Sequence, residues 1–328
     1  MKTITLLPGE RLTISNLGRE GAVPARITRE AADIIAAVRA EGDAALHRFS
    51  STFDGIDPTD FRVPRERVDA ALDEIDPSLL AALEKAAAQI RDFHERQARQ
   101  SWFTTRVDGT MLGMQVTPVR AAGIYVPGGR AQYPSTVLMN AIPAKVAGVE
   151  RVVMVTPPQR DGEISPATLA AAKVAGVDEI YLVGGAQAVA ALAYGTESVP
   201  RVDKITGPGN AYVAAAKRLV SGDVGIDMIA GPSEVCVLAD ATAEPAVVAA
   251  DLMAQAEHDP LAACYLVTCN ATLARRVTEA VEVLCAQSPR AEITRSSLTD
   301  QGTIVIAPDR ATAIDAVNTI APEHLELH

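Results

Sequence analysis

Gln255 and His258 are residues whose types and spacing could support metal chemistry. They are three positions apart at the end of a helix predicted over 245–256, so both side chains leave it on the same side. An amide oxygen and an imidazole nitrogen can bind one metal ion. A histidine near a helix end is also a common surface residue, so the pair needs support from the rest of the chain.

Glu323 and His324 form a second candidate pair, directly after Pro322. A carboxylate beside an imidazole suits general acid–base catalysis near neutral pH, because histidine titrates there and burial can raise the pKa of a glutamate. Such pairs also occur on ordinary surfaces, so the role of this one depends on the fold around it.

Three glycine-rich segments each lie between a predicted strand and a predicted helix. They are Tyr125-Val-Pro-Gly-Gly-Arg130, Val183-Gly-Gly-Ala-Gln187 and Thr206-Gly-Pro-Gly-Asn210. Free backbone N–H groups and helix N-termini favour anions in such loops. None of the three is a GxGxxG or GxxxxGK[S/T] motif, and a single Gly pair can be only a tight turn. Three of them at corresponding places in one sheet favour a phosphate-bearing ligand.

A sheet covered by helices must position these residues. From Val119 onward, β-branched runs alternate with alanine-rich segments, which predicts an α/β fold with parallel strands flanked by helices. Loops that follow such strands share one edge of the sheet, where ligands bind in open α/β folds. Strands are expected at 123–126, 151–156, 179–183, 204–206, 226–229, 235–239, 264–268 and 303–307, with none after them. Helices are expected at 135–147, 166–175, 186–194, 210–220, 245–256, 271–286 and 311–320.

The first part of the chain follows another pattern. Residues 1–22 are expected to form an extended arm, and the helical spacing of apolar residues predicts helices at 28–40, 44–49, 65–75 and 78–97.

The composition is that of a soluble globular protein. The chain has 328 residues, 48% of them hydrophobic, and a net charge of −11, which argues against a non-specific nucleic-acid surface. It shows no signal peptide and no apolar run of the roughly 20 residues that span a membrane. The four cysteines form no CxxC pair and are expected mostly as buried free thiols, which fits a reducing, cytoplasmic location.

One long segment resembles the histidinol dehydrogenase family. It runs from Ile226-Asp-Met-Ile-Ala-Gly-Pro-Ser-Glu234 into Asp251-Leu-Met-Ala-Gln-Ala-Glu-His258. The three glycine-rich segments match the family in the same order. So do the further motifs Glu41-Gly-Asp-Ala-Ala-Leu46, Phe53-Asp-Gly55 and Ala321-Pro-Glu-His-Leu-Glu326, so the resemblance covers essentially the whole chain.

The resemblance implies an enzyme that uses zinc and NAD to oxidise L-histidinol to L-histidine, the end of histidine biosynthesis. Two hydride transfers pass through an aldehyde held in the site. It also implies a cytoplasmic homodimer of two Rossmann-like lobes, similar to aldehyde dehydrogenase and preceded by a helical N-terminal region. We therefore expect an arm at 1–22, a first lobe from 23–120 with 237–328, and a second lobe at 121–236 on the NAD side.

The family's motifs also imply roles for individual residues. Gln255 and His258 correspond to zinc ligands, and Glu323 and His324 to the catalytic pair. The implied substrate contacts are Ser233, Gln255, His258 and His324, and the implied NAD contacts are Tyr125, Gln187 and Asn210.

The chemistry of these residue types agrees with the implied roles. His324 would take the hydroxyl proton as hydride leaves, and Glu323 would activate water to attack the aldehyde. The alternative thiohemiacetal route needs an activated cysteine. Cys236 is the cysteine nearest Ser233 in sequence, but it is predicted within a strand and has no cationic neighbour in sequence.

The family pattern continues for roughly a hundred residues beyond His328. That part carries another zinc-ligand Asp, a substrate-contacting Glu and a zinc-ligand His supplied across the dimer. By motif, His328 is none of these. Two protein ligands rarely hold zinc tightly, so weak zinc binding and low activity are expected. Two alternatives stay open: a related zinc and NAD enzyme for another small polar alcohol, and a non-catalytic remnant that keeps the fold.

Overall fold

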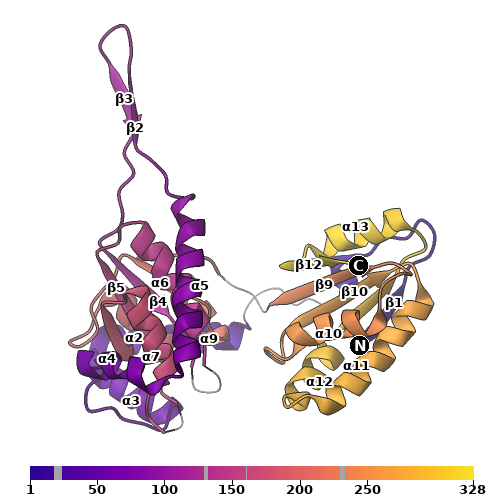
Figure 1. The fold of residues 1–328 in the computed structure, drawn as a ribbon, viewed down its shortest axis with the longest axis horizontal. Helices are drawn as coiled ribbons and strands as arrows, with labels where there is room; N and C mark the ends of the chain where they lie inside the picture. The colour runs from indigo at the N-terminus through magenta and orange to yellow at the C-terminus, as the bar shows by residue number, and fades with distance from the viewer. Residues whose placement is uncertain (18–23, 129–131, 160, 230–232) are drawn as a thin grey trace. The chain divides into compact units, whose positions relative to one another are not determined.

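The chain forms two compact units, each with its own sheet. The computed structural model describes residues 1–17, 24–128, 132–159, 161–229 and 233–328. Unit 1 consists of Met1–Ala22 and Ala230–His328, and unit 2 consists of Val23–Ile229. Figure 1 shows a helix-flanked sheet in each. No helix within the described ranges is both long and apolar enough to cross a membrane.

Unit 2 is built on a parallel sheet in the order β6-β5-β4-β7-β8. The chain enters at the central strand, moves outward on one side, and then returns to the other side of β4. This is the strand order of a doubly wound nucleotide-binding fold, whose ligand crevice lies where the order reverses, here between β4 and β7. The strands are β4 (Ala121–Tyr125), β5 (Arg151–Thr156), β6 (Glu179–Leu182), β7 (Lys204–Thr206) and β8 (Gly225–Ile226).

Helices cover both faces of this sheet, and each face has a separate apolar core. One core joins the sheet to α2 (Ala25–Glu41), α3 (Asp43–Phe53), α8 (Gly185–Tyr194) and α9 (Ala211–Val220). The other joins it to α4 (Arg65–Glu74), α5 (Pro77–Glu95), α6 (Pro134–Val146) and α7 (Pro166–Ala175). Alternate residues of one strand point to opposite cores, as Val153 and Met154 do, so the strands are buried on both sides.

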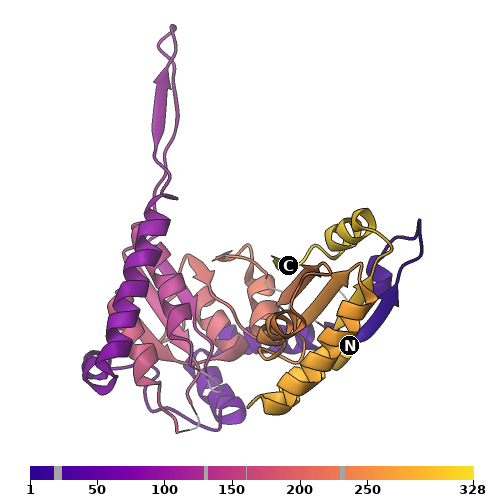
Figure 2. The ribbon, with the colours of Figure 1, turned by 45° about the vertical axis from the view of Figure 1, so that its right-hand side comes forward.

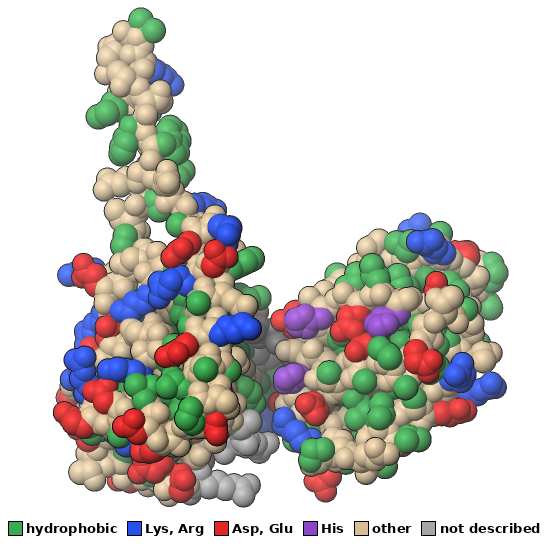
Figure 3. Space-filling view, viewed as in Figure 1, with side chains coloured by type: hydrophobic (Ala, Val, Ile, Leu, Met, Phe, Trp, Pro, Cys, Tyr) green, Lys and Arg blue, Asp and Glu red, His purple; other side chains and the backbone are tan. Residues whose placement is uncertain are grey.

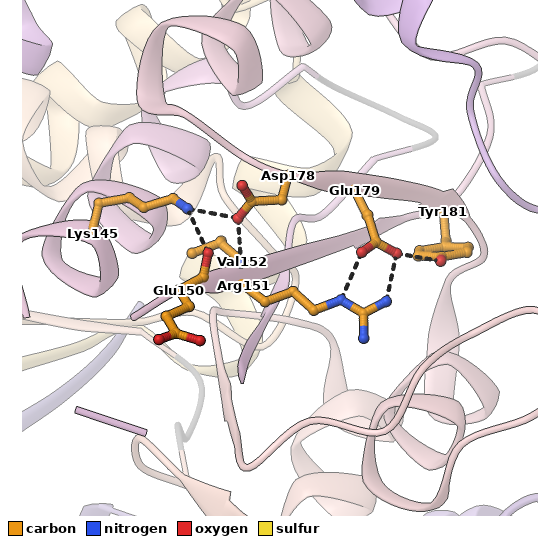
Figure 4. Close-up of polar contacts among 7 residues, drawn as sticks. All are labelled: Lys145, Glu150, Arg151, Val152, Asp178, Glu179 and Tyr181. Atoms are coloured by element: carbon orange, nitrogen blue, oxygen red, sulfur yellow. Dashed lines mark hydrogen bonds and ion pairs between the residues drawn. The ribbon is translucent and has the colours of Figure 1, made fainter. Parts of the chain in front are cut away.

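A polar network ties the amino ends of β5 and β6 together (Figure 4). Arg151 binds both carboxylate oxygens of Glu179, at 2.6 and 2.9 Å, and the Tyr181 hydroxyl donates to the same carboxylate at 2.7 Å. Asp178 accepts hydrogen bonds from Lys145 at 2.6 Å and from the backbone N–H of Val152 at 2.7 Å. These groups satisfy one another, so we interpret the network as structural.

A two-stranded antiparallel hairpin projects from unit 2 (Figures 1 and 2). Its strands are β2 (Trp102–Thr105) and β3 (Met111–Met114), and all their residues are exposed. The sequence did not predict it, because the hairpin contributes to neither apolar core of the unit.

Unit 1 has a parallel sheet in the order β1-β11-β10-β9-β12. The strands are β1 (Lys2–Thr5), β9 (Glu234–Ala239), β10 (Ala263–Thr268), β11 (Thr303–Ile306) and β12 (His324–Leu327). One face packs against α10 (Pro245–Ala256), α11 (Ala271–Gln287) and α12 (Ala291–Asp300), and the other against α13 (Arg310–Ile320) and the short α1 (Ile14–Leu17).

The predicted fold class is confirmed, with parallel sheets flanked by helices. The two units of the structure, however, divide the chain at other residues than the predicted lobes. Residues 23–120 belong with 121–229 because Ile34 and Val38 of α2 share a core with Val189 and Val213 of α8 and α9. The predicted arm contains β1, which pairs with β11 at an edge of unit 1. The prediction that no strand follows residues 303–307 was also wrong, since β12 pairs with β9 at the opposite edge of the same sheet.

Candidate active site

The residues singled out from the sequence fall into two groups, one in each unit. Unit 2 carries the predicted cofactor contacts Tyr125, Gln187 and Asn210, all at the carboxyl edge of its sheet. Unit 1 carries the predicted metal, substrate and catalytic residues Ser233, Gln255, His258, Glu323 and His324.

Tyr125 is the last residue of β4 and is buried, with 4% of its surface exposed. Its hydroxyl oxygen accepts a hydrogen bond from the backbone N–H of Gly185 at 3.0 Å, which links β4 to the start of α8. Burial raises the pKa of Tyr125 to about 12, so the phenol stays neutral and its own proton can still be donated.

Gln187 lies in the first turn of α8 and is 2% exposed. Its Oε1 atom is buried and has no hydrogen-bond partner among the described residues. A Cβ at Gly185, where φ is +67°, would lie 2.6 Å from this oxygen. The Gln187 amide therefore fits beside this turn only because residue 185 is glycine. A buried acceptor without a donor is costly and is typical of a site that binds a ligand or water.

Asn210 begins α9 as its N-cap. Its Oδ1 atom accepts from the backbone N–H groups of Tyr212 at 3.0 Å and Val213 at 3.2 Å, which leaves the amide NH₂ group as a donor. The preceding loop touches β4, because a Cβ at Gly207 would lie 2.1 Å from the carbonyl oxygen of Tyr125. The carboxyl ends of β4 and β7 therefore meet at the point where the strand order reverses.

Lys217 and Asp227 hold this loop in place, a role that was not predicted from the sequence. Lys217 is only 3% exposed; its ammonium group pairs with Asp227 and donates to the carbonyl oxygen of Gly207 at 2.9 Å. Asp227 Oδ2 accepts from the N–H of Gly207 at 2.9 Å, so both polar groups of this peptide unit are held. A lysine on the apolar face of an alanine-rich helix was the available signal.

In unit 1 the predicted residues lie at the amino edge of the sheet, where its strands begin. Ser233 directly precedes β9, and its carbonyl oxygen accepts from Ala263 at the start of β10 at 3.0 Å. His324 is the first residue of β12 and pairs with Val235 of β9. α10 returns the chain from the carboxyl edge of β9 to the amino edge of β10, so its last turn brings Gln255 to the same edge.

The side chains at this edge differ in exposure. Gln255 is buried at 9% exposed, whereas His258, two residues beyond α10, is exposed. His324 Nε2 lies 4.0 Å from Glu323 Oε1, and these side chains are 60% and 54% exposed. The predicted Gly231-Pro232 turn lies outside the described residues.

The cysteines bear on the alternative thiohemiacetal route, which needs an activated thiol. None of the four is in a disulfide bond, and Cys236, Cys264 and Cys285 are buried, as the sequence predicted for most of them. Burial raises the pKa of Cys264 to about 12, and the pKa of the exposed Cys269 is also raised, first by desolvation. Cys236 lies within β9 at 0% exposed, which disfavours the thiohemiacetal route.

The two edges differ in chemistry. The unit 2 edge combines a helix N-terminus, hydroxyl and amide donors and a buried acceptor, which suits a phosphate-bearing ligand with hydroxyl groups. The unit 1 edge combines an amide, two imidazoles, a hydroxyl and a carboxylate, which suits metal binding and proton transfer.

Comparisons with known proteins agree with these observations. Residues 18–328 match the family model of histidinol dehydrogenase. The chain is 51% identical over 327 residues to the histidinol dehydrogenase of Bacillus subtilis (strain 168), covering 100% of this chain and 76% of the relative. It is 55% identical over 304 residues to that of Pseudomonas aeruginosa, covering 92% of this chain and 69% of the relative.

A solved structure has the same fold. The crystal structure of histidinol dehydrogenase from Elizabethkingia anophelis aligns with a TM-score of 0.87 at 36% identity, over 100% of this chain and 75% of that one. The chain therefore belongs to the histidinol dehydrogenase family of oxidoreductases.

Proposed function

We propose that this protein oxidises L-histidinol to L-histidine with NAD, in two hydride transfers through a bound aldehyde. The observation that carries the proposal is the grouping of Ser233, Gln255, Glu323 and His324 at one edge of unit 1, in a chain whose relatives are named for histidinol. As the final step of a biosynthetic route, this activity would take place in the cytoplasm.

Unit 2 is the side that we propose binds NAD. Its strand order reverses beside Tyr125 and the loop before Asn210, where doubly wound folds bind dinucleotides. The N-terminus of α9 would face a phosphate, and the unpartnered Oε1 of Gln187 would accept a hydroxyl or amide proton. When bound, NAD accepts the hydride that leaves the alcohol carbon.

His324 and Glu323 would divide the proton transfers. His324 would take the hydroxyl proton as hydride leaves the alcohol. Glu323 would deprotonate water for attack on the aldehyde, forming the hydrate that loses the second hydride. Their exposed side chains, 4.0 Å apart, leave room for substrate and water beside them.

Zinc fits the donor set of Gln255 and His258, though only as part of a coordination sphere. An amide oxygen and an imidazole nitrogen both suit zinc, and bound zinc would act as a Lewis acid that orients the substrate. Stable zinc sites use three or four protein ligands, so we expect weak binding to this pair and activity that depends on added zinc.

The proposed assembly is a homodimer, and the hairpin of unit 2 supports it. A lone two-stranded hairpin is marginally stable in water, and exposed apolar patches often mark interfaces. Trp102, Leu112 and Met114 lie on one face of the hairpin by its register, and all three are exposed.

Formation of NADH from L-histidinol with zinc in excess tests the proposed function. Replacing His324 by Ala should lower turnover by about 10²–10⁴-fold, the usual contribution of a general base. Glu323→Gln should slow oxidation of the aldehyde more than that of the alcohol. His94→Ala is the control, because that histidine lies on α5 and contacts Gln97 within unit 2.

Two results would contradict the proposal. Unchanged turnover in His324→Ala would exclude the assigned base. A faster reaction with another small polar alcohol would make L-histidinol the wrong substrate, and the absence of turnover with every alcohol and with zinc present would favour a non-catalytic protein.

A further inference from the structure

Three side chains outside the predicted site gather between the edge strand β12 and α10. His328 Nε2 lies 3.1 Å from Asp251 Oδ2 and 3.7 Å from Glu326 Oε2. The ligand atoms of all three lie within 4.8 Å of one another. Figure 3 shows histidine side chains on one face of unit 1, beside acidic side chains.

The backbone explains why these residues meet. Glu326 and His328 are two positions apart on an extended segment, so their side chains lie on the same face. His328 continues the ladder past β12: its N–H donates to Leu238 at 2.9 Å and its carbonyl accepts from Asp240 at 2.9 Å. Asp251 projects from the middle of α10 toward this face.

The contact between His328 and Asp251 lacks the geometry of a hydrogen bond. Asp251 Oδ2 is buried and has no hydrogen-bond partner among the described residues, although the imidazole nitrogen is 3.1 Å away. Ligands around one transition-metal ion have this relation: bonds of about 2.0–2.2 Å place neighbouring donor atoms roughly 3–3.5 Å apart, with lone pairs directed at the ion. Two carboxylates and a neutral imidazole also balance the charge of a divalent cation.

We propose that Asp251, Glu326 and His328 bind one divalent transition-metal ion, such as Zn²⁺ or Mn²⁺. One nitrogen and two oxygen donors suit these ions, and three protein ligands leave positions for water. The three residues differ from the Gln255–His258 pair: Asp251 precedes Gln255 by about one turn of α10, and His258 lies beyond the end of that helix.

The proposed ion would have a positional role. Among the described strands, β12 is an edge strand that pairs with β9 alone, and Glu323-His324 lie at its beginning. An ion held by Glu326, His328 and Asp251 would attach this strand to α10, the helix that carries Gln255. The site thus adds to the proposed function without depending on it.

Titration of the metal-free full chain with Co²⁺, followed by visible absorption and calorimetry, tests this site. We expect His328→Ala and Asp251→Asn to weaken one Co²⁺ site by about tenfold or more, since even outer-sphere partners contribute that much. His258→Ala should keep this site. His47→Ala is the matched control, because it also removes a histidine that contacts an aspartate, Asp57 at 2.6 Å, but in unit 2.

Thermal unfolding in the same titration supplies a second measurement. Co²⁺ should raise the Tm of the wild type and of His258→Ala. It should raise the Tm of His328→Ala, and of the milder variant His328→Gln, by a smaller amount. Unchanged Co²⁺ affinity and Tm shift in the His328 and Asp251 variants would overturn the proposal and leave an ion pair. Loss of NADH formation in His258→Ala with this Co²⁺ site intact would separate the site from the catalytic proposal.

Discussion

At the scale of single residues, Gly207 shows how tightly the switch point of unit 2 is packed. Its φ is +115°, and a Cβ there would lie 2.1 Å from a backbone oxygen of Tyr125. Lys217 and Asp227 bind its carbonyl and N–H groups. The peptide unit beside the predicted cofactor residues is thus constrained by sterics and by charge.

We predict that Gly207→Ala is far more destabilising than Gly222→Ala. Gly222 has a similar φ of +108°, but a Cβ there meets nothing within 4 Å. Gly222→Ala should lower the free energy of unfolding only by the backbone strain, about 1–2 kcal/mol. Gly207→Ala should lower it by at least ~2 kcal/mol more, because backbone atoms must also move apart. Urea denaturation measures both, and equal costs would show that β4 and the loop after β7 can separate freely.

At the scale of elements, Arg151 and Glu179 join the amino ends of β5 and β6. The hydrogen bonds from Arg151 lower the pKa of Glu179 below its usual value, and burial opposes this effect only partly. Because the folded pKa is the lower one, the stabilisation is complete above the unfolded pKa and is lost as the pH falls through the folded pKa.

Arg151→Met should therefore destabilise unit 2 in a pH-dependent way. We expect the free energy of unfolding to fall by about 1–2 kcal/mol at neutral pH. This is less than for a buried ion pair, because the Arg151 side chain is 44% exposed. The difference from the wild type should shrink as the pH falls below about 4.5, where Glu179 is protonated in the unfolded chain. Unfolding by urea at several pH values measures it, and a loss that does not depend on pH would indicate lost packing instead.

The elements themselves were largely predictable from local sequence. β5, β7, α7 and α10 have the predicted bounds, because buried strands are β-branched runs and both helices begin with Pro in the first turn. α12 was missed because Ala291–Asp300 is polar and has a weak apolar pattern. β12 was missed because its exposed residues Leu325 and Leu327 resemble a chain end until they pair with β9.

At the scale of the whole molecule, the hairpin is the surface that we propose for association with a second copy. It places Trp102 and Phe103, at 54% and 61% exposed, on a ribbon outside both cores of unit 2. A second copy of the chain would remove such side chains from water.

Trp102→Ala with Met114→Ala should shift the protein from dimer to monomer without unfolding unit 2. The two residues face each other across the hairpin, and neither belongs to a core. Sedimentation gives the mass, and circular dichroism monitors the fold. Val107→Ala, at the exposed turn, is the control. A double variant that remains dimeric would place the interface elsewhere.

The sequence by itself determined the fold class, most elements and the family, because periodicity, proline and glycine positions and contiguous motifs are local properties of the chain. It also singled out Gln255, His258, Glu323 and His324 by residue type. Only the tertiary structure decided that residues 23–120 pack with unit 2, that Lys217 holds the loop at Gly207, and that Asp251 meets His328. These pairs are far apart in the chain, and their contacts exist only once sheet order and helix packing bring them together.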